Sequence, residues 1–342
     1  MTQPQSSSAS PMLYALLVRD FEEPSDSVIE IVDVARKTQI RTFSVGSRLA
    51  TSLAVAPDGS HLYVVDVSQS EIAIFDSFGD SVGAVGLDFP PRDCVLSRSG
   101  AMLYVSTRHG LVVIDTAARK MVATVESGAD ELQGIAISPD DKLVGAVSLD
   151  FGGGGGGLDR HPALYLFETA TLTPNRVGVS DPDAPAGAVV DPTDVVFTDI
   201  GRAVLWDDNC DSFYQVDVAS AKQDPAGTAR LGRSGGSLVN FNNVLAYSGL
   251  TRKAYVLKDS PDGLAVLDVA SAAVKTIGGF AAQPLVLALQ PDERKLYISV
   301  ASRFSGGGAD TLDEFDVETE SFVRGVYTFQ RPDVSVRDMQ VL

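Results

Sequence analysis

Imidazole and guanidinium groups are the side chains of this sequence that could move protons and hold anions. The chain has three histidines, and two of them, His109 and His161, directly follow Arg108 and Arg160. A guanidinium can grip a carboxylate or a developing oxyanion while a neighbouring imidazole transfers the proton. His109 and His161 are therefore candidate catalytic residues, or metal ligands with nearby carboxylates. Their spacing follows no zinc motif, and an isolated surface histidine is the commoner case.

Charged residues also recur at one position of a repeated phrase. Two copies of the phrase begin with an arginine followed by an aspartate, and a third has a threonine before Asp194. Charges that lie where strands converge lose water and need either partners or a ligand. Ion pairs between neighbouring repeats, or bonds that cap the loops, are the alternative to a ligand. The resulting candidates are Asp93 and Asp194 as catalytic groups, and Arg92, Arg337 and Asp338 as ligand contacts.

The segment WDDNCD at 206–211 is the richest in oxygen ligands. It could hold a hard cation such as Ca²⁺, but it lacks the regular ligand spacing of an EF-hand loop, and solvated loop carboxylates are the alternative. Trp206 and Asp207 are retained as candidate ligand contacts, and no metal is identified. Cys210 is disfavoured as a nucleophile because its acidic neighbours raise the pKa of a thiol.

A repeated phrase determines which elements position these residues. Clear copies are LAVAPDGSHLYVVDV at 53–67, IAISPDDKLVGAVSLD at 135–150 and LALQPDERKLYISVA at 287–301. Each reads as apolar strand, tight turn, apolar strand, and seven units of about 45 residues fill the chain. We therefore predict an all-β fold, a seven-bladed β-propeller with four antiparallel strands per blade. Residues 12–342 form this single domain, preceded by a disordered tail at 1–11.

The order of the expected strands predicts how the ring closes. The chain opens on second, third and fourth strands at 12–44 and finishes on a first strand at 336–341, so the two ends should complete one blade. Seven expected third strands end in an acid, which we interpret as capping the following turn rather than as a shared site. These acids are Asp33, Asp76, Asp115, Glu168, Asp217, Asp268 and Asp316.

In such a ring the second-to-third loops and the blade-to-blade loops share one face, where ligand sites usually lie. Arg48 and Arg303 join the candidate ligand contacts on that face, whereas His61 falls in a turn of the opposite face. Two long loops of the site face contain glycine runs, at 152–157 and 306–308. They act either as a mobile cover over the channel or as tolerated insertions.

The strands LYVVDV and EIAIFD, the stretch LYVST followed by GLVVIDTAARKMVATV, and the turn AISPDDK resemble the YVTN family of seven-bladed propellers. The resemblance covers nearly all of residues 12–342 and is sharpest in blades two, three and seven. It implies the propeller fold. Members of the family include cell-surface proteins, subunits of quinone-cofactor amine dehydrogenases and propellers similar to lactonases, so the resemblance implies no single reaction.

Composition restricts the partners of the protein. A net charge of −18 disfavours nucleic acid and anionic membranes, which bind clustered Lys and Arg. Two cysteines imply no disulfide framework, and the start of the chain lacks the apolar core of a signal peptide, so we expect a soluble, cytoplasmic protein. No nucleotide, phosphate-loop, zinc-protease or serine-hydrolase motif appears, and no cofactor is identified.

These observations favour a binding module that presents a small-molecule or protein site at the mouth of the channel. The alternative is an enzyme of lactonase, lyase or isomerase type that acts on a small carboxylate or lactone at the same place. A third reading is a subunit that supports the cofactor of a partner. Whether the protein is an enzyme is left open by the sequence, because sequence does not show which side chains converge.

Overall fold

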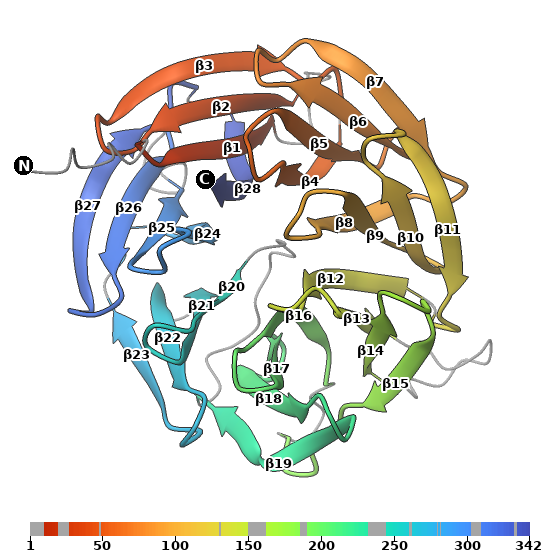
Figure 1. Cartoon of the computed structure of the whole chain (residues 1–342). Helices are drawn as coiled ribbons and strands as arrows, with labels where there is room; N and C mark the ends of the chain where they lie inside the picture. The colour runs from red at the N-terminus through yellow and green to blue at the C-terminus, as the bar shows by residue number, and fades with distance from the viewer. Residues whose placement is uncertain are drawn as a thin grey trace, which may run out of the picture.

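The computed structural model describes residues 10–19, 27–47, 49–129, 131–149, 162–184, 190–231, 244–259, 262–278, 280, 282–301, 309–331 and 334–342. The regular elements in these ranges are 28 β-strands in seven four-stranded antiparallel sheets. The sheets radiate around a central axis as the blades of a propeller (Figure 1). The predicted fold class is therefore confirmed. No helix in the described ranges is long and apolar enough to cross a membrane.

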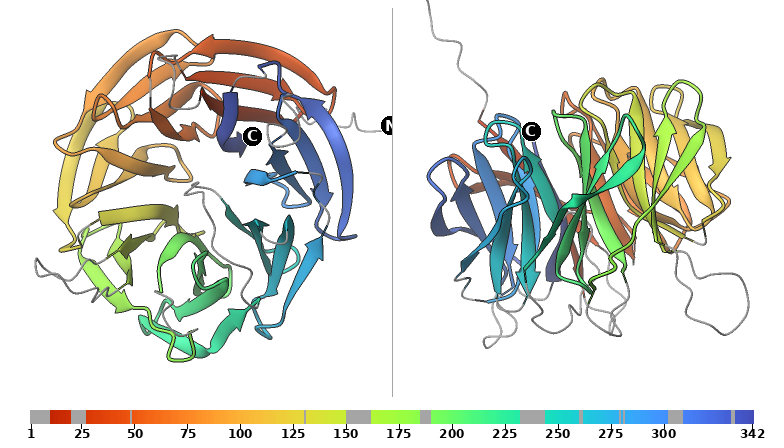
Figure 2. Two further views of the ribbon diagram at one scale, coloured as in Figure 1. Left: turned by 180° about the vertical axis from the view of Figure 1, so that it is seen from behind. Right: turned by 90° about the horizontal axis from the view of Figure 1, so that it is seen from below.

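Each blade runs from a strand beside the axis to a strand at the rim (Figures 1 and 2). We number the blades in chain order, starting with the sheet that holds the N-terminal strand. The strands of blades 1 to 3, from the axis outward, are β28 (Val334–Val341), β1 (Met12–Arg19), β2 (Val28–Asp33), β3 (Thr38–Ser44); β4 (Ala50–Val55), β5 (His61–Asp66), β6 (Glu71–Asp76), β7 (Ser81–Gly86); β8 (Pro91–Leu96), β9 (Met102–Thr107), β10 (Gly110–Asp115) and β11 (Lys120–Glu126).

Blades 4 to 7 follow the same order. Their strands are β12 (Glu131–Ile137), β13 (Leu143–Leu149), β14 (Ala163–Glu168), β15 (Pro174–Gly178); β16 (Pro192–Phe197), β17 (Arg202–Asp207), β18 (Ser212–Asp217), β19 (Lys222–Arg230); β20 (Leu245–Ser248), β21 (Lys253–Asp259), β22 (Asp262–Asp268), β23 (Val274–Gly278); β24 (Pro284–Leu289), β25 (Lys295–Val300), β26 (Thr311–Asp316) and β27 (Ser321–Thr328).

The hydrophobic core lies between the blades. The middle strands are buried on both faces, which is why β5 reads LYVVD without polar alternation, whereas the rim strand β3 alternates exposed and half-buried residues. At the first interface, Leu16 and Ile29 of blade 1 pack against Leu53 and Val64 of blade 2. Six further clusters of buried apolar residues complete the described core. The ring is thus held together by its interfaces, and no blade carries a core of its own.

The two ends of the chain close the ring inside blade 1. Strand β28 pairs with β1 from Leu13 opposite Val341 to Arg19 opposite Val334. Met12 and Leu342 exchange two backbone hydrogen bonds of 2.9 Å each. The C-terminus therefore lies beside the axis (Figure 1), and the predicted completion of one blade by both ends is confirmed.

The acids that end the third strands cap the turns that follow, as predicted. Asp115 Oδ1 accepts a hydrogen bond of 2.8 Å from the backbone N–H of Ala118, and Asp316 Oδ1 accepts one of 2.7 Å from that of Thr319. The residue that closes each of these turns has a positive φ, such as Arg119 at 53° and Glu320 at 52°. These carboxylates are structural, one in each blade.

Candidate functional site

The inner strands are bent by β-bulges at the place where the charged residues recur. In blade 3, Pro91 pairs with Thr107 while Asp93 pairs with Ser106, so Arg92 is the extra residue of the bulge. Arg337 occupies the same position in blade 1. A bulge redirects the side chains on either side of it. Each bulge thus directs the side chain of the arginine and the side chain of the following aspartate to different places.

The three recurring aspartates hold neighbouring blades together. Asp338 accepts a hydrogen bond of 2.6 Å from the backbone N–H of Leu53, and Asp93 accepts one of 3.2 Å from that of Ile135. Asp194 accepts two of 3.1 Å each, from Val244 and Leu245. In each case the donor lies on or just before the inner strand of the next blade. These carboxylates therefore bind backbone N–H groups of the next blade, where the alternative to a ligand was ion pairs between repeats or loop-capping bonds.

Other residues make the equivalent connection where the repeat lacks an aspartate. Ser52 stands at this position in blade 2 and donates a hydrogen bond of 2.7 Å to Asp93. Blade 4 has Gly134 there, and a Cβ on this glycine would lie 2.6 Å from the carbonyl oxygen of Thr193. The backbones of blades 4 and 5 therefore approach too closely for any side chain at this position.

Burial strongly perturbs two of these carboxyl groups. Desolvation raises the pKa of Asp93 to about 6, against the opposing effect of its hydrogen bonds. Desolvation also raises the pKa of Asp194 to about 7, with the negative charge of Asp93 as the next cause. Such values are those expected of acid–base groups. Both side chains, however, are almost fully buried and engaged with the backbone of the next blade.

Two of the candidate arginines, Arg92 and Arg108, lie at the same rim of blade 3 as an aromatic contact of His109. Phe89 lies just before β8 and contacts the imidazole of His109, in the turn between β9 and β10, with ring centroids 4.3 Å apart. Arg108 beside it is exposed. Arg92 Nε lies 2.8 Å from Glu131 Oε1 of blade 4, and its side chain remains 41% exposed. This rim thus combines two cations with a flat apolar surface.

His109 and the two catalytic aspartate candidates are not assembled into a proton-transfer group. In the described part of the chain, no carboxylate lies within hydrogen-bond distance of the His109 ring. Asp93 is held instead by Ser52, Cys94 and Ile135. A general base normally needs a partner that orients it.

The acid-rich segment of blade 5 also makes structural hydrogen bonds. Asp207 is fully buried, and it accepts hydrogen bonds from the backbone N–H groups of Asp191 (2.8 Å) and Cys210 (3.0 Å) and from the Tyr214 hydroxyl (3.3 Å). Burial raises the pKa of Asp207 to about 6. Trp206 packs in the cluster between blades 5 and 6, with its ring 4.9 Å from that of Phe213.

Metal binding by this segment finds no support in the described residues. Among them, no group of three or more His, Cys, Asp or Glu side chains is arranged to hold an ion. Asp211 instead lies 3.5 Å from Lys258 of blade 6. Burial also raises the pKa of Cys210 to about 12, which disfavours a thiolate at this position.

Several predicted site residues lie outside the described part of the chain. They are Arg48, Arg160, His161, Arg303 and both glycine runs, at 152–157 and 306–308. Of the other ligand contacts, Arg337 is half-buried at its bulge and Asp338 is fully buried. A cavity that the sequence did not predict opens instead on the opposite face, between blades 2 and 3.

The fold and the rim define a seven-bladed β-propeller with charged residues at one end of its channel. No protein-family model matches the sequence, and no curated protein matches it. Among solved structures, a putative 6-phosphogluconolactonase from Bacteroides fragilis superimposes with a TM-score of 0.68 and 14% identity over 99% of each chain. Hydrazine synthase from Kuenenia stuttgartiensis gives a TM-score of 0.60 and 18% identity over 79% of this chain and 77% of that one. At these identities the likeness shows the fold.

Proposed function

We propose that the rim of blade 3 is a binding site for a small carboxylate. The observation that carries the proposal is the contact between Phe89 and His109 beside the half-exposed Arg92. A guanidinium pairs with a carboxylate through two parallel hydrogen bonds, and an aromatic face covers the apolar part of a ligand. The rim carries the exposed Arg108 and the half-exposed Arg92 in a chain of net charge −18.

Binding is favoured over catalysis because the acidic candidates have structural partners. Asp93 and Asp194 hold the inner strands of blades 4 and 6, and His109 has no described carboxylate that orients it. The carboxylate of Glu131 already forms an ion pair with the guanidinium of Arg92. An incoming carboxylate can replace Glu131 without leaving the guanidinium unpaired, so the site exchanges one anion for another.

The test is calorimetric titration of the protein with gluconate, the carboxylate that corresponds to the lactone class of the structural neighbour. We expect Arg92→Gln to weaken gluconate binding about tenfold or more, because a hydrogen bond between charged groups contributes about 1.5–3 kcal/mol. Phe89→Ala should also weaken binding. Arg98→Gln serves as the control, because Arg98 is an exposed arginine in a turn on the opposite face of blade 3. Equal affinity in Arg92→Gln and the native protein would refute the proposal.

Lactone hydrolysis at the same rim is the second candidate. It is favoured by the superposition over 99% of both chains with a putative 6-phosphogluconolactonase. Hydrolysis of glucono-1,5-lactone should then exceed the spontaneous rate and fall at least 100-fold in His109→Ala, since a positioned acid–base group contributes about 10²–10⁴-fold. A rate equal to the spontaneous one, together with gluconate binding, leaves the binding module as the function.

A further inference from the structure

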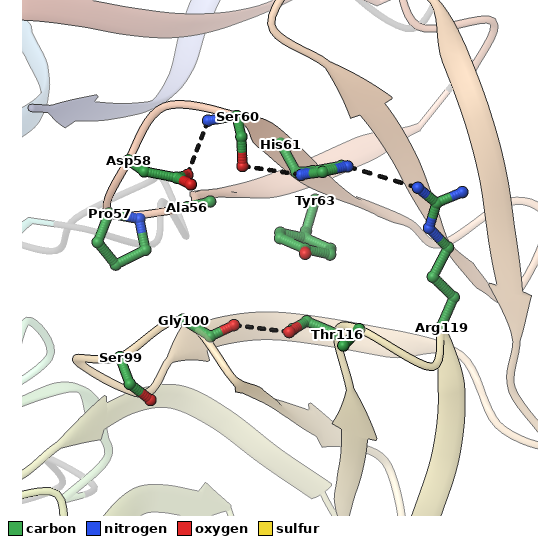
Figure 3. A pocket seen from close by; sticks show the side chains of 11 residues that line it. Ala56, Pro57, Asp58, Ser60, His61, Tyr63, Ser99, Gly100, Thr116 and Arg119 are labelled. Atoms are coloured by element: carbon green, nitrogen blue, oxygen red, sulfur yellow. Dashed lines mark hydrogen bonds between the residues drawn. The ribbon is translucent and has the colours of Figure 1, made fainter.

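A cavity of about 280 Å³ lies between blades 2 and 3 on the face opposite the proposed carboxylate site (Figure 3). We call it the inter-blade groove. The turn between β4 and β5 forms one wall, and the turns of blade 3 form the other. The two walls approach closely at Gly100, where an added Cβ would lie 2.8 Å from Pro57. The polar residues that line the groove are Asp58, Ser60, His61, Tyr63, Ser99, Thr116 and Arg119.

A row of contacts runs along the upper wall, and the donor and the acceptor of each contact can be assigned. Arg119 Nη2 lies 3.4 Å from His61 Nε2, and His61 Nδ1 lies 2.9 Å from Ser60 Oγ (Figure 3). An arginine only donates, so Nε2 accepts and the neutral imidazole carries its proton on Nδ1. Ser60 then accepts from His61, and its hydroxyl is free to donate to Asp58. Hydrogen bonds from Ser60 lower the pKa of Asp58. His61 therefore does not act as a base toward Ser60.

The repeat shows what is unusual about this contact. His61 opens the second strand of blade 2 opposite Asp76, and the equivalent position holds a cation in blades 5 to 7. Each of those cations has a carboxylate partner at 2.6–2.8 Å. The pairs are Arg202 with Asp224, Lys253 with Glu320 and Lys295 with Glu314.

The pair between blades 6 and 7 is the direct counterpart of the pair in the groove. Lys253 opens β21, and Glu320 closes the turn before β27 of the next blade with φ 52°. Arg119 closes the same turn of blade 3 with φ 53°, and faces His61 across the same interface. Where blades 6 and 7 place an acid between Lys253 and Lys275, blades 2 and 3 place a cation against a base. No carboxylate of the described residues pairs with Arg119, whose contacts are the Val82 carbonyl oxygen and His61.

We propose that the inter-blade groove binds a small polyhydroxylated oxyanion, of the sugar acid or sugar phosphate class. The oxyanion would accept hydrogen bonds from both Arg119 and His61 on the groove side of their 3.4 Å contact, as Glu320 accepts from Lys253 and Lys275 between blades 6 and 7. An imidazole that takes up a proton donates from Nε2 to such an anion. The remaining wall presents hydroxyl groups of Ser60, Tyr63 and Thr116 and the carboxylate of Asp58, which accepts hydrogen bonds from ligand hydroxyls and repels a second negative group.

The oxyanion subsite is tested with sulfate, titrated against chloride at equal ionic strength. We expect sulfate to shift the side-chain NMR signal of His61, identified among the three histidines by its loss in His61→Asn. Arg119→Gln should weaken this sulfate effect at least tenfold. Arg98→Gln should leave it unchanged, since Arg98 is an exposed arginine of the same face and lies outside the groove. Equal sulfate response in Arg119→Gln and the native protein would overturn the proposal.

A charge exchange separates ligand binding from a purely structural contact. Arg119→Glu supplies the acid that the equivalent turn of blade 7 already carries. We expect this variant to melt at or above the temperature of Arg119→Gln without sulfate, and to gain nothing from sulfate. Stabilisation of Arg119→Glu by sulfate as large as that of the native protein would contradict the assignment.

The ligand class is tested with glycerol 3-phosphate, which adds two hydroxyl groups to the oxyanion. We expect it to bind more tightly than sulfate in the native protein, and Asp58→Asn to reduce this difference several-fold. Asp140→Asn is the matched control, because Asp140 occupies the same turn position in blade 4. Equal affinity for both probes would refute the polyhydroxylated class. Arg92→Gln, at the opposite face, should change neither titration, so this outcome is independent of the carboxylate site.

Discussion

At the scale of single residues, carboxylates with raised pKa values control how stability depends on pH. Desolvation raises the pKa of Asp93 to about 6, of Asp194 to about 7 and of Asp207 to about 6. An unfolded aspartate has a pKa of about 3.9, so the folded state binds more protons between the two values. The stability that these groups contribute is complete below about pH 4 and is lost as pH rises through 6 to 7.

We therefore predict that the melting temperature falls between pH 5 and pH 8. Carboxylates with lowered pKa values, such as Asp140 at about 2, titrate in a separate acid window and do not oppose this trend. Thermal unfolding monitored by circular dichroism measures the slope. The double variant Asp93→Asn with Asp194→Asn should flatten it by about 1.4 kcal/mol for each unit of raised pKa removed. A melting temperature that rises across this range would contradict the prediction.

Glu131 is expected to act as an internal competitor at the carboxylate site. Its carboxylate lies 2.8 Å from Arg92 Nε, so a ligand must displace it. Glu131→Gln should strengthen gluconate binding about three- to tenfold in calorimetric titration, because the neutral amide holds the guanidinium less tightly. Glu126→Gln is the control, since Glu126 is an exposed acid at the same end of blade 3. An unchanged affinity in Glu131→Gln would show that Arg92 is not a ligand contact.

At the scale of elements, β28 is the strand on which closure of the ring depends. It pairs with β1 over its whole length, and Asp338 within it also binds the inner strand of blade 2. We predict that deletion of residues 334–342 abolishes cooperative unfolding or lowers the melting temperature by more than about 10 °C. The milder Asp338→Ala leaves a buried N–H without its acceptor and should cost about 1–3 kcal/mol. Deletion of residues 1–9 serves as the control for shortening the chain.

The elements were largely predictable from the sequence. The repeated phrase located the inner strands, and the acids at the ends of the third strands were correctly interpreted as turn caps. The roles of Arg92 and Asp93 were harder to separate. A bulge at Arg92 directs Asp93 to the next blade, and the register that creates it depends on the partner strand β9. Sequence alone shows that the two residues are adjacent and does not show where their side chains point.

The inter-blade groove was missed for a different reason. His61 was dismissed because it lies on the face opposite the candidate histidines, and Arg119 lies 58 residues further along the chain. The signal that could have found the groove is the alignment of repeats. The position of His61 holds a cation in three other blades, and the position of Arg119 corresponds to Glu320 in blade 7. A histidine and an arginine at positions where another pair of neighbouring blades has a cation and an acid identify an unusual interface.

At the scale of the whole molecule, the net charge of −18 should make stability depend on salt. Self-repulsion of a highly charged chain destabilises its compact state, and added salt screens it. Exposed ion pairs such as Lys142 with Asp140 are also screened, but each contributes only about 0–1 kcal/mol. We predict that raising sodium chloride from about 20 to about 500 mM at pH 8 increases the melting temperature. A decrease would mean that the ion pairs dominate.

The pairing of Met12 with Leu342 has a consequence for how the gene could be rearranged. Because the first and last described strands are neighbours in one sheet, the closed ring has no privileged starting point. A short peptide joining Leu342 to Met12 would allow new termini to be cut at an exposed turn such as that of Asp80, in the rim of blade 2. Such a circular permutant should reach the same architecture, with closure now supplied by a different blade.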